Sequence, residues 1–304
     1  MAGIRHRAEF LAFQMVKFLF SLLPRRLGLL FGRFLGVAFY ALDKRHRLIA
    51  LSNLKIAFGS ELPLSSLKGI ARKSFIHFGK FLADLIKFSR LKKEQKNKLI
   101  TVEGEENLDK AIEMGKGILI FSAHYGSWEI APHFLSKKAK FYVIARPLDN
   151  DLLENELLKM RTTLGAEVIY KQQAAKHILQ SLREKEMVAI LIDQNVLRSQ
   201  AVFVDFFGKS AATTPSLAAF FLRTKSPLLP VFCYPTSSNT YRIEILQPLQ
   251  IDLSDEYDQD VLKITQICTK IIESQIRKNP YHWLWFHNRW KTRPENEVKG
   301  ENES

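Results

Sequence analysis

Short apolar runs alternate with helical patterns from residue 99 onward, and this alternation constrains the fold more than any other feature of the sequence. The runs have the length of buried strands, and the segments between them space their apolar residues as helices do. Such alternation is typical of an α/β fold with a mostly parallel central sheet flanked by helices. The predicted strands are Thr101–Glu103, Ile118–Phe121, Phe141–Ala145, Glu167–Tyr170, Val188–Ile192, Leu228–Tyr234 and Tyr241–Ile245. The predicted helices are Leu108–Met114, Trp128–Leu135, Leu152–Leu164, Ala174–Arg183, Pro215–Arg223 and Val261–Arg277.

The apolar run Ile118–Phe121 ends in a polar turn that carries the best candidate for chemistry. His124 follows this strand, and Ser127 is a suitable N-cap for the helix that starts next. The carboxyl ends of parallel strands are where α/β sheets place their functional side chains. With His124 in the turn and Glu129 in the first helical turn, the carboxylate can hold one ring nitrogen and leave the other free to accept a proton. We therefore expect a His124–Glu129 pair acting as a base on a hydroxyl. The structural alternative is a rim histidine that is hydrogen-bonded to a local partner.

Further polar residues occur at chain positions that should neighbour His124. Arg146 follows one predicted strand, Asp193 and Gln194 follow another, and Arg161 lies near the end of a predicted helix. Taken singly, each fits a cap, a turn or a surface charge. Together they predict one polar, partly cationic rim above an apolar sheet. No Gly-x-Gly-x-x-Gly or Gly-Lys-Ser motif follows any strand, which disfavours nucleotide-dependent chemistry.

Two apolar helical patterns, Phe10–Leu23 and Leu27–Leu42, open the chain. Neither reaches the run of about 18 apolar residues that a transmembrane helix needs. We expect both to lie in a membrane interface with their cations toward phosphate, and one tilted span from about Leu11 is the alternative. The domains we predict are membrane-anchoring helices at 1–45, an amphipathic helical region at 46–98, an α/β domain at 99–293 and a disordered tail at 294–304.

Three smaller features carry open alternatives. Glycines 28, 32 and 36 form either a close helix contact inside the fold, which we favour, or a dimer face. The charge run Leu91–Lys98 is predicted to be a solvated link. The segment Pro280–Trp290 holds three of the four tryptophans, and it either walls a lipid-sized groove, lies at a headgroup boundary or packs against the sheet edge.

The formal net charge of +14 calls for an anionic partner, which can be a lipid surface, a nucleic acid or an acidic carrier protein. The two cysteines, Cys233 and Cys268, lie in separate apolar surroundings. They indicate neither a disulfide framework nor a zinc site, and they fit a reducing compartment.

The chain resembles the late lipid A acyltransferases and the related phosphatidylinositol mannoside acyltransferases, within the glycerolipid (lysophospholipid) acyltransferase superfamily. The resemblance covers nearly the whole chain. It departs from the family pattern in two loops, at Asp151 and at Gly59, where the family commonly has proline. The segments that carry it are Ser52–Phe58, the His124-x4-Glu129 block, Arg146-Pro147, Arg161, Asp193-Gln194, Phe206–Lys209 and Trp285–Trp290.

This resemblance implies a glycerolipid-acyltransferase-like fold and an O-acyltransferase of lipid A biosynthesis. The enzyme would move a fatty acyl chain from acyl carrier protein or coenzyme A to a lipid hydroxyl. Because the sequence places no serine or cysteine nucleophile beside His124, we expect direct transfer without a covalent intermediate or a metal, and no bound cofactor. It implies His124 as general base, Glu129 as the group that orients it, and Arg161 and Asp193 as site residues. Arg161 is expected to meet anionic substrate or oxyanion charge, and Asp193 to position a neighbouring group. Arg146 and Gln194 complete the substrate-binding set that we predict.

The implied partners are a lipid acceptor in the membrane and acyl carrier protein, and no nucleic acid. The protein would be a monomer at the cytoplasmic face of the cell inner membrane. Two alternatives stay open. One is the same chemistry on another glycolipid or phospholipid acceptor, and the other is a non-catalytic protein that binds anionic lipid.

Overall fold

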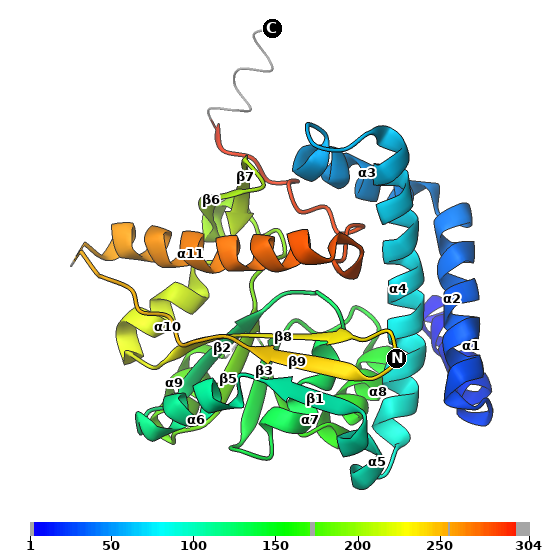
Figure 1. The fold of residues 1–304 in the computed structure, drawn as a ribbon, viewed down its shortest axis with the longest axis horizontal. Coiled ribbons are helices and arrows are strands. Elements are labelled where there is room, and N and C mark those ends of the chain that lie inside the picture. The colour runs from blue at the N-terminus through cyan, green and yellow to red at the C-terminus, as the bar shows by residue number, and fades with distance from the viewer. Residues whose placement is uncertain (1–2, 171–173, 255, 296–304) are drawn as a thin grey trace, which may run out of the picture.

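The computed structural model describes residues 3–170, 174–254 and 256–295. Figure 1 shows a twisted sheet with helices on both faces, a wall of long helices along one side and a small hairpin beyond the long helix α11. The expected α/β class, with a mostly parallel central sheet flanked by helices, is confirmed. Residues 296–304 of the predicted disordered tail lie outside the described part.

The side wall consists of the N-terminal helices. They are α1 (Ile4–Leu22), α2 (Arg25–Leu42), α3 (Lys44–Phe58) and α4 (Leu64–Arg90). The first two correspond to the helical patterns predicted at Phe10–Leu23 and Leu27–Leu42, and the other two fall largely in the helical region predicted at 46–98. Within the described residues, no helix has both the length and the apolar content needed to cross a membrane.

Helices α2 and α4 pack unusually closely because glycines face one another across their contact. A Cβ atom added to Gly32 would lie 2.6 Å from the carbonyl oxygen of Gly79. One added to Gly36 would clash with the backbone of Phe75 and Ile76. Gly32 and Gly36 therefore form the close contact inside the fold that was favoured above, whereas a Cβ atom at Gly28 would meet no atom closer than 3.7 Å.

The main sheet has seven strands in the order β1-β9-β8-β2-β5-β3-β4. Among the described residues, five neighbouring pairs are parallel and the β8–β9 pair is antiparallel. The strands are β1 (Ile100–Glu103), β2 (Ile118–Ser122), β3 (Phe141–Ala145), β4 (Ala166–Tyr170), β5 (Met187–Leu191), β8 (Leu228–Pro235) and β9 (Tyr241–Ile245).

Strand β2 lies in the interior of this sheet, and every one of its residues is buried. Leu119 and Phe121 join a core that includes the helices α9, α10 and α11, whereas Ile118 and Ile120 join a second core with α4, α6 and α7. Because both faces of the sheet are covered, β2 has a continuous apolar sequence rather than an alternating one.

Apart from α5, which was not predicted, the connecting helices lie close to their predicted positions. They are α5 (Lys93–Lys98), α6 (Glu105–Glu113), α7 (Pro132–Leu135), α8 (Asp151–Thr163), α9 (Ala174–Arg183), α10 (Ser216–Thr224) and α11 (Tyr257–Lys278). Strand β6 (Val202–Phe206) pairs with β7 (Lys209–Thr213) as a hairpin apart from the main sheet.

Three predictions about these segments were wrong in detail. The predicted solvated link at 91–98 contains the helix α5, in which Lys96 is buried. Strand β7 was missed, because its sequence Lys-Ser-Ala-Ala-Thr has little of the β-branched and aromatic character that marks strands. The predicted helix Trp128–Leu135 is broken into a 3-10 helix, η1 (Trp128–Ile130), and the short α7, with Pro132 at the start of α7.

The tryptophan-rich segment after α11 packs inside the protein. Trp283 and Trp285 are fully buried, and their ring centroids lie 4.6 Å apart. This packing supports the simplest of the alternatives given above. The side chains of Asn53 and Ser74, from α3 and α4, donate hydrogen bonds to carbonyl oxygens of this segment. The segment thus joins the helical wall to the sheet.

Candidate active site

The turn after β2 is held between β8 and the C-terminal segment. Gly126 has φ +64°, and an added Cβ atom would clash with the carbonyl oxygen of Cys233, so this position requires glycine. The Gly126 amide donates to the carbonyl of His282 at 2.9 Å, and the Ser127 amide donates to that of Cys233 at 2.6 Å. His124 is therefore presented at the carboxyl end of β2 by a turn with little freedom.

Asp193 is the carboxylate that holds His124. It follows β5, the strand paired with β2 in parallel, so the ends of the two strands meet at the same edge. Its Oδ1 lies 2.9 Å from His124 Nδ1, and its Oδ2 accepts the His124 backbone amide at 3.0 Å. The indole Nε1 of Trp283 donates to the same Oδ2 at 2.8 Å. Asp193 accordingly positions a neighbouring group, which is the histidine itself.

The electrostatics favour an ionised Asp193 beneath the imidazole. Burial opposes ionisation of this carboxyl, but the charge and hydrogen bonds of His124 and the hydrogen bond from Trp283 hold its pKa below the ordinary value. An ionised Asp193 accepts a proton-bearing Nδ1, which leaves the lone pair of His124 on Nε2. The Gln194 side-chain nitrogen lies 3.3 Å from Nε2, and the His124 side chain is 22% exposed. His124 Nε2 can therefore accept a proton from a bound group.

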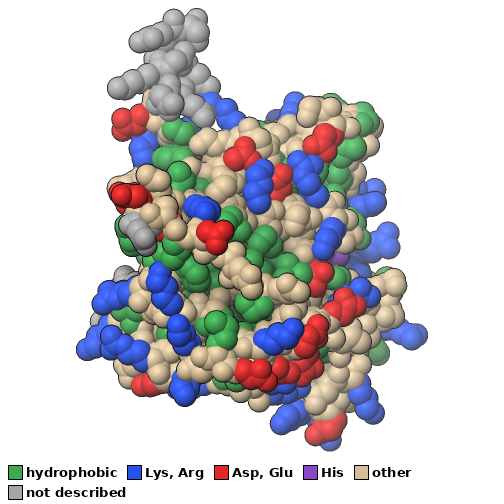
Figure 2. Space-filling view, turned by 60° about the vertical axis from the view of Figure 1, so that its left-hand side comes forward, with side chains coloured by type: hydrophobic (Ala, Val, Ile, Leu, Met, Phe, Trp, Pro, Cys, Tyr) green, Lys and Arg blue, Asp and Glu red, His purple; other side chains and the backbone are tan. Residues whose placement is uncertain are grey.

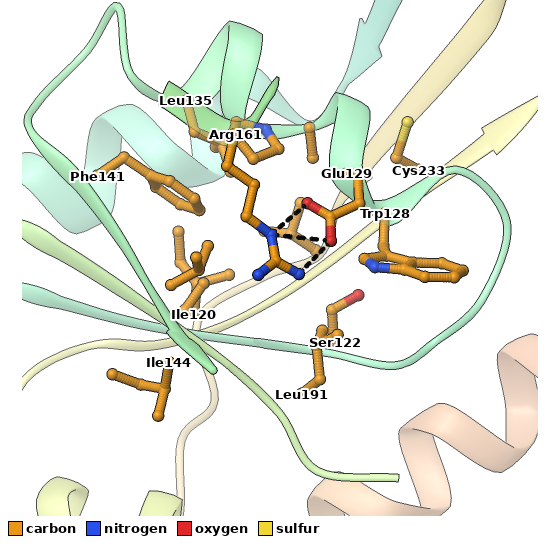
Figure 3. Close-up of a pocket in the computed structure, with 15 residues that line it drawn as sticks. Ile120, Ser122, Trp128, Glu129, Leu135, Phe141, Ile144, Arg161, Leu191 and Cys233 are labelled. Carbon is orange, nitrogen blue, oxygen red and sulfur yellow. Dashed lines mark hydrogen bonds and ion pairs between the residues drawn. The ribbon is translucent and has the colours of Figure 1, made fainter. Parts of the chain in front are cut away.

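The expected contact between His124 and Glu129 is not what the structure shows. Glu129 instead forms a bidentate pair with Arg161, whose Nη2 lies 2.5 Å from Oε1 and whose Nε lies 3.0 Å from Oε2 (Figure 3). The reason is local. Residues of a 3-10 helix are about 120° apart around its axis, and Trp128 is the residue of η1 that contacts the His124 ring, with centroids 5.3 Å apart. Glu129 consequently points toward α8 rather than toward the imidazole.

Glu129 and Arg161 form a charged pair on the wall of an apolar cavity. Figure 3 shows the guanidinium and the carboxylate meeting among aliphatic and aromatic side chains. Burial alone would lower the pKa of Arg161, but the charge of Glu129 raises it above the ordinary value. The cavity measures about 60 Å³. Its lining also includes Ile120, Ser122, Trp128, Ala131, Pro132, Leu135, Phe141, Val143, Ile144, Ala189, Leu191, Val231 and Cys233.

The structure brings most of the predicted site residues together and leaves one apart. His124, Asp193 and Gln194 are in mutual contact, and Trp128 links His124 to the cavity that holds Glu129 and Arg161. Arg146 instead lies on the surface, where its side chain is 79% exposed and its Nη2 is 3.6 Å from Asp149. Its substrate-binding role stays a prediction.

Two residues next to the His124–Asp193 pair were missed as site residues. Trp283 contacts Asp193 directly, and His287 Nε2 accepts the Asn195 amide at 3.1 Å, next to Gln194 in the chain. Burial lowers the pKa of His287 to about 4, so it stays a neutral acceptor near neutral pH. The concentration of aromatic and histidine residues in the C-terminal segment was the signal available for both, but no spacing linked them to His124. Across the described parts of the chain, no group of three or more His, Cys, Asp or Glu residues is arranged to hold a metal ion.

Comparison with known proteins decides the family. The sequence profile of the bacterial lipid A biosynthesis acyltransferases matches residues 3–292. The chain belongs to this family. It is 26% identical over 253 residues to a lipid A biosynthesis palmitoleoyltransferase of Escherichia coli (strain K12), a match that covers 83% of this chain and 80% of that protein. The resemblance inferred from the sequence is thereby confirmed.

Two further relatives show the breadth of this group of acyltransferases. A lipid A biosynthesis acyltransferase of Haemophilus influenzae is 24% identical over 260 residues, which is 83% of this chain and 79% of that protein. A phosphatidylinositol mannoside acyltransferase of Mycobacterium tuberculosis is 24% identical over 194 residues, covering 62% of this chain and 59% of that protein. The names of these relatives specify more than one glycolipid acceptor.

Proposed function

We propose that this protein is a membrane-bound O-acyltransferase in which His124 is the general base on a lipid hydroxyl. The observation that carries this proposal is the His124–Asp193 pair. Asp193 is fully engaged by His124 and Trp283, while His124 Nε2 meets only the Gln194 amide nitrogen at 3.3 Å, a contact that a substrate hydroxyl would replace on the partly exposed imidazole. An unassisted alcohol is a poor nucleophile near neutral pH, so such a base is what acyl transfer to a hydroxyl requires.

The proposed reaction is direct transfer. His124 Nε2 accepts the hydroxyl proton while the hydroxyl oxygen attacks the carbonyl carbon of a fatty acyl thioester. The C–S bond then breaks, and the imidazolium returns the proton to the leaving sulfur. Asp193 stabilises the imidazolium, as the buried carboxylate of a catalytic triad does. In this proposal the Arg161–Glu129 pair lies on the wall of the adjoining cavity, and an N–H group of Arg161 donates to the oxyanion.

The thioester donor is acyl carrier protein or coenzyme A, and the acceptor is a lipid A precursor. The lipid acceptor is supported by the names of the E. coli and H. influenzae relatives. The apolar cavity beside Trp128 measures about 60 Å³ and has room for only a few methylene groups of a fatty chain. Both donors are anionic, as are lipid A precursors, and the protein carries a net charge of +14. Figure 2 shows Lys and Arg side chains around the face that comes forward from the left of Figure 1, with Asp and Glu side chains among them.

The helices α1 and α2 would hold the protein on the cytoplasmic face of the inner membrane. Both expose large apolar side chains, and the unburied Arg26 and Arg33 of α2 suit a phosphate-rich surface. The exposed apolar residues of the two helices are Ile4, Leu11, Met15, Phe18, Leu19, Leu22, Leu27, Leu30, Phe34 and Leu42. An apolar groove of about 320 Å³ lies between α1, α2 and α4 and adds to the surface that lipid can cover.

The test combines an activity with a binding measurement. Detergent-purified protein is incubated with acyl carrier protein thioester or acyl coenzyme A and with a lipid A precursor, and the acceptor is followed by mass spectrometry. The wild type should add one acyl chain. His124→Ala should reduce the rate by about 10²–10⁴ while its binding to anionic vesicles persists. His177→Ala, which replaces an exposed histidine away from the site, is the matched control and should behave as wild type.

The result also separates the two alternatives. If transfer occurs only with a phosphatidylinositol mannoside or a lysophospholipid, the chemistry stands and the acceptor is corrected, an outcome that the mycobacterial relative makes worth testing. If no acceptor is acylated and His124→Ala changes nothing, the acyl-transfer proposal is wrong and an anionic-lipid-binding protein takes its place.

A further inference from the structure

A cluster of positive charge lies away from the active site, where the end of α4 and the helix α5 meet α7. Lys93 and Lys96 belong to α5, and Lys137 follows α7. Both helices lie at the lower edge of the molecule in Figure 1. The imidazole of His133, from α7, lies between these elements and touches the Phe88 ring of α4, with centroids 5.7 Å apart.

One amide oxygen joins the two sides of this cluster. Asn97 Oδ1, at the end of α5, accepts Lys137 Nζ at 2.6 Å and lies 3.1 Å from His133 Nε2. The side chain that ties α5 to α7 is thus neutral. It satisfies hydrogen bonds without offsetting any of the charge.

No carboxylate neutralises the three lysines. Within the described residues, Lys93, Lys96 and Lys137 form no ion pair, whereas the adjacent Lys138 binds both Glu105 and Asp109. The nearest acid in sequence, Glu94, is exposed, and it forms no ion pair with any described residue.

Lys96 is the most unusual member of the cluster. It is only 4% exposed, and its ammonium lies 5.9 Å from the centroid of the Phe88 ring. A lysine is almost never buried to this degree without an anionic partner. Burial lowers its pKa. Burial of the charged Lys96 therefore destabilises the folded state, and a bound anion would offset that destabilisation.

The charges of the three lysines converge on His133. Burial first, and then Lys137, Lys96 and Lys93, lower the pKa of this imidazole to about 4. Burial and the charge of Lys93 likewise lower the pKa of Lys137. Lys93 precedes Lys96 and Asn97 by three and four residues on α5, so the three side chains lie on one face of that helix, and Lys137 Nζ donates to Asn97 Oδ1 at 2.6 Å. The three lysines therefore border one small region, where a single multivalent anion can meet them.

We propose that Lys93, Lys96 and Lys137 form a binding site for a phosphate group, beyond the acyl-transfer site. Phosphate carries more than one negative charge and only acceptor oxygens toward ammonium donors, so it matches three lysines that have no carboxylate partner. Asn97 and His133 position Lys137 and the end of α5 around it. The phosphate can come from a lipid headgroup or from a soluble phosphate ester, since the chemistry is the same for both.

The first experiment measures binding of inorganic phosphate to the full-length protein in detergent. The thermal midpoint is followed as sodium phosphate replaces sodium chloride at constant ionic strength. The wild type should gain several degrees, because a ligand that binds the folded state stabilises it. The double variant Lys93→Gln/Lys137→Gln should lose most of that gain. The matched control Lys68→Gln/Lys110→Gln, which removes two exposed lysines of α4 and α6, should keep it.

A second variant separates a ligand site from a structural role. Lys96→Met fills the same space without charge, so the protein should melt higher than wild type in chloride yet respond less to phosphate. A lysine that merely supports the fold would instead lower the midpoint in chloride. The proposal is overturned if phosphate gives wild type no gain over chloride, or if the control and the lysine variants respond alike.

A third arm identifies the source of the phosphate. Co-sedimentation compares neutral phosphatidylcholine vesicles with vesicles that also contain phosphatidic acid, and soluble glycerol phosphate serves as competitor. Weaker binding of Lys93→Gln/Lys137→Gln to the phosphatidic acid vesicles assigns the site to a headgroup. If the double variant binds these vesicles as wild type does but its thermal midpoint no longer rises with glycerol phosphate, the site is assigned to a soluble ester. None of these measurements uses transferase activity, so they stand or fall independently of the proposed function.

Discussion

The two carboxylates near His124 have different partners, and the histidine was predicted to pair with Glu129, whereas the structure pairs it with Asp193. Glu129 is close to His124 in the chain, but η1 turns its side chain toward Arg161. Asp193 is 69 residues away and reaches Nδ1 because β2 and β5 are parallel neighbours. The histidine, both acids and the arginine were all identified as site residues from the sequence. Their pairing was not, because it depends on strand order and on one turn of 3-10 helix.

This division predicts different consequences for two isosteric variants. Asp193→Asn should lower kcat by about 10²–10⁴, because the amide no longer fixes the imidazole or stabilises its charge. Glu129→Gln should lower the free energy of unfolding by about 3–5 kcal/mol, because it leaves the buried guanidinium of Arg161 without a counter-charge. Transfer assays and chemical denaturation measure the two effects.

A double variant provides the control for the stability effect. Glu129→Leu/Arg161→Met removes both charges from the apolar cavity and should recover most of the stability lost in Glu129→Gln. If Glu129→Gln unfolds at the same denaturant concentration as wild type, the ion pair does not have the structural role assigned to it here.

At the level of elements, prediction succeeded where local pattern decides and failed where packing decides. Strands β3 and β9 and helix α9 have the bounds expected from apolar periodicity, since nothing in their surroundings opposes it. Strand β7 was missed because its small residues are selected by the β6 partner and by Arg289, which donates to the Ala212 carbonyl and the Thr213 hydroxyl. The sheet order, with β9 between β1 and β8, brings distant strands together and has no local signal.

The close contact of α2 with α4 yields a prediction at this scale. Gly36→Ala adds a methyl group against the backbone of Phe75 and Ile76, which forces the helices apart and should lower the free energy of unfolding by about 1–3 kcal/mol. Gly69→Ala is the matched control on α4, because an added Cβ atom there meets nothing within 4 Å. The control should be neutral or up to about 1 kcal/mol more stable, since alanine favours helix. Urea denaturation monitored by circular dichroism distinguishes the two, and equal midpoints would contradict the tight contact.

At the scale of the whole molecule, the C-terminal segment helps to connect the helical wall to the turn after β2. Asn53 and Ser74 bind its carbonyls, and the segment in turn supplies Trp283 to Asp193. His77 of α4 lies at the same junction, with Nε2 3.0 Å from the Gly126 carbonyl and its ring 4.7 Å from that of His282. Because wall, turn and segment share these contacts, loosening the junction should weaken the fold and the site together.

This junction makes stability depend on pH. Burial lowers the pKa of His77 to about 4, and burial together with His77 lowers that of His282 to about 3, whereas both would titrate near 6.5 in the unfolded chain. Between those values the unfolded state binds protons that the folded state does not, so the free energy of unfolding falls as the pH falls from about 6.5 toward 4. Each histidine adds about 1.4 kcal/mol per pH unit to that slope.

His282→Phe keeps a ring in place of an imidazole whose Nδ1 has no partner within the described residues, and it should flatten the slope. His177→Phe, which replaces an exposed histidine, should leave the slope unchanged. Denaturation midpoints measured across this pH range decide the matter, because equal slopes in all three proteins would show that His282 takes up its proton without unfolding.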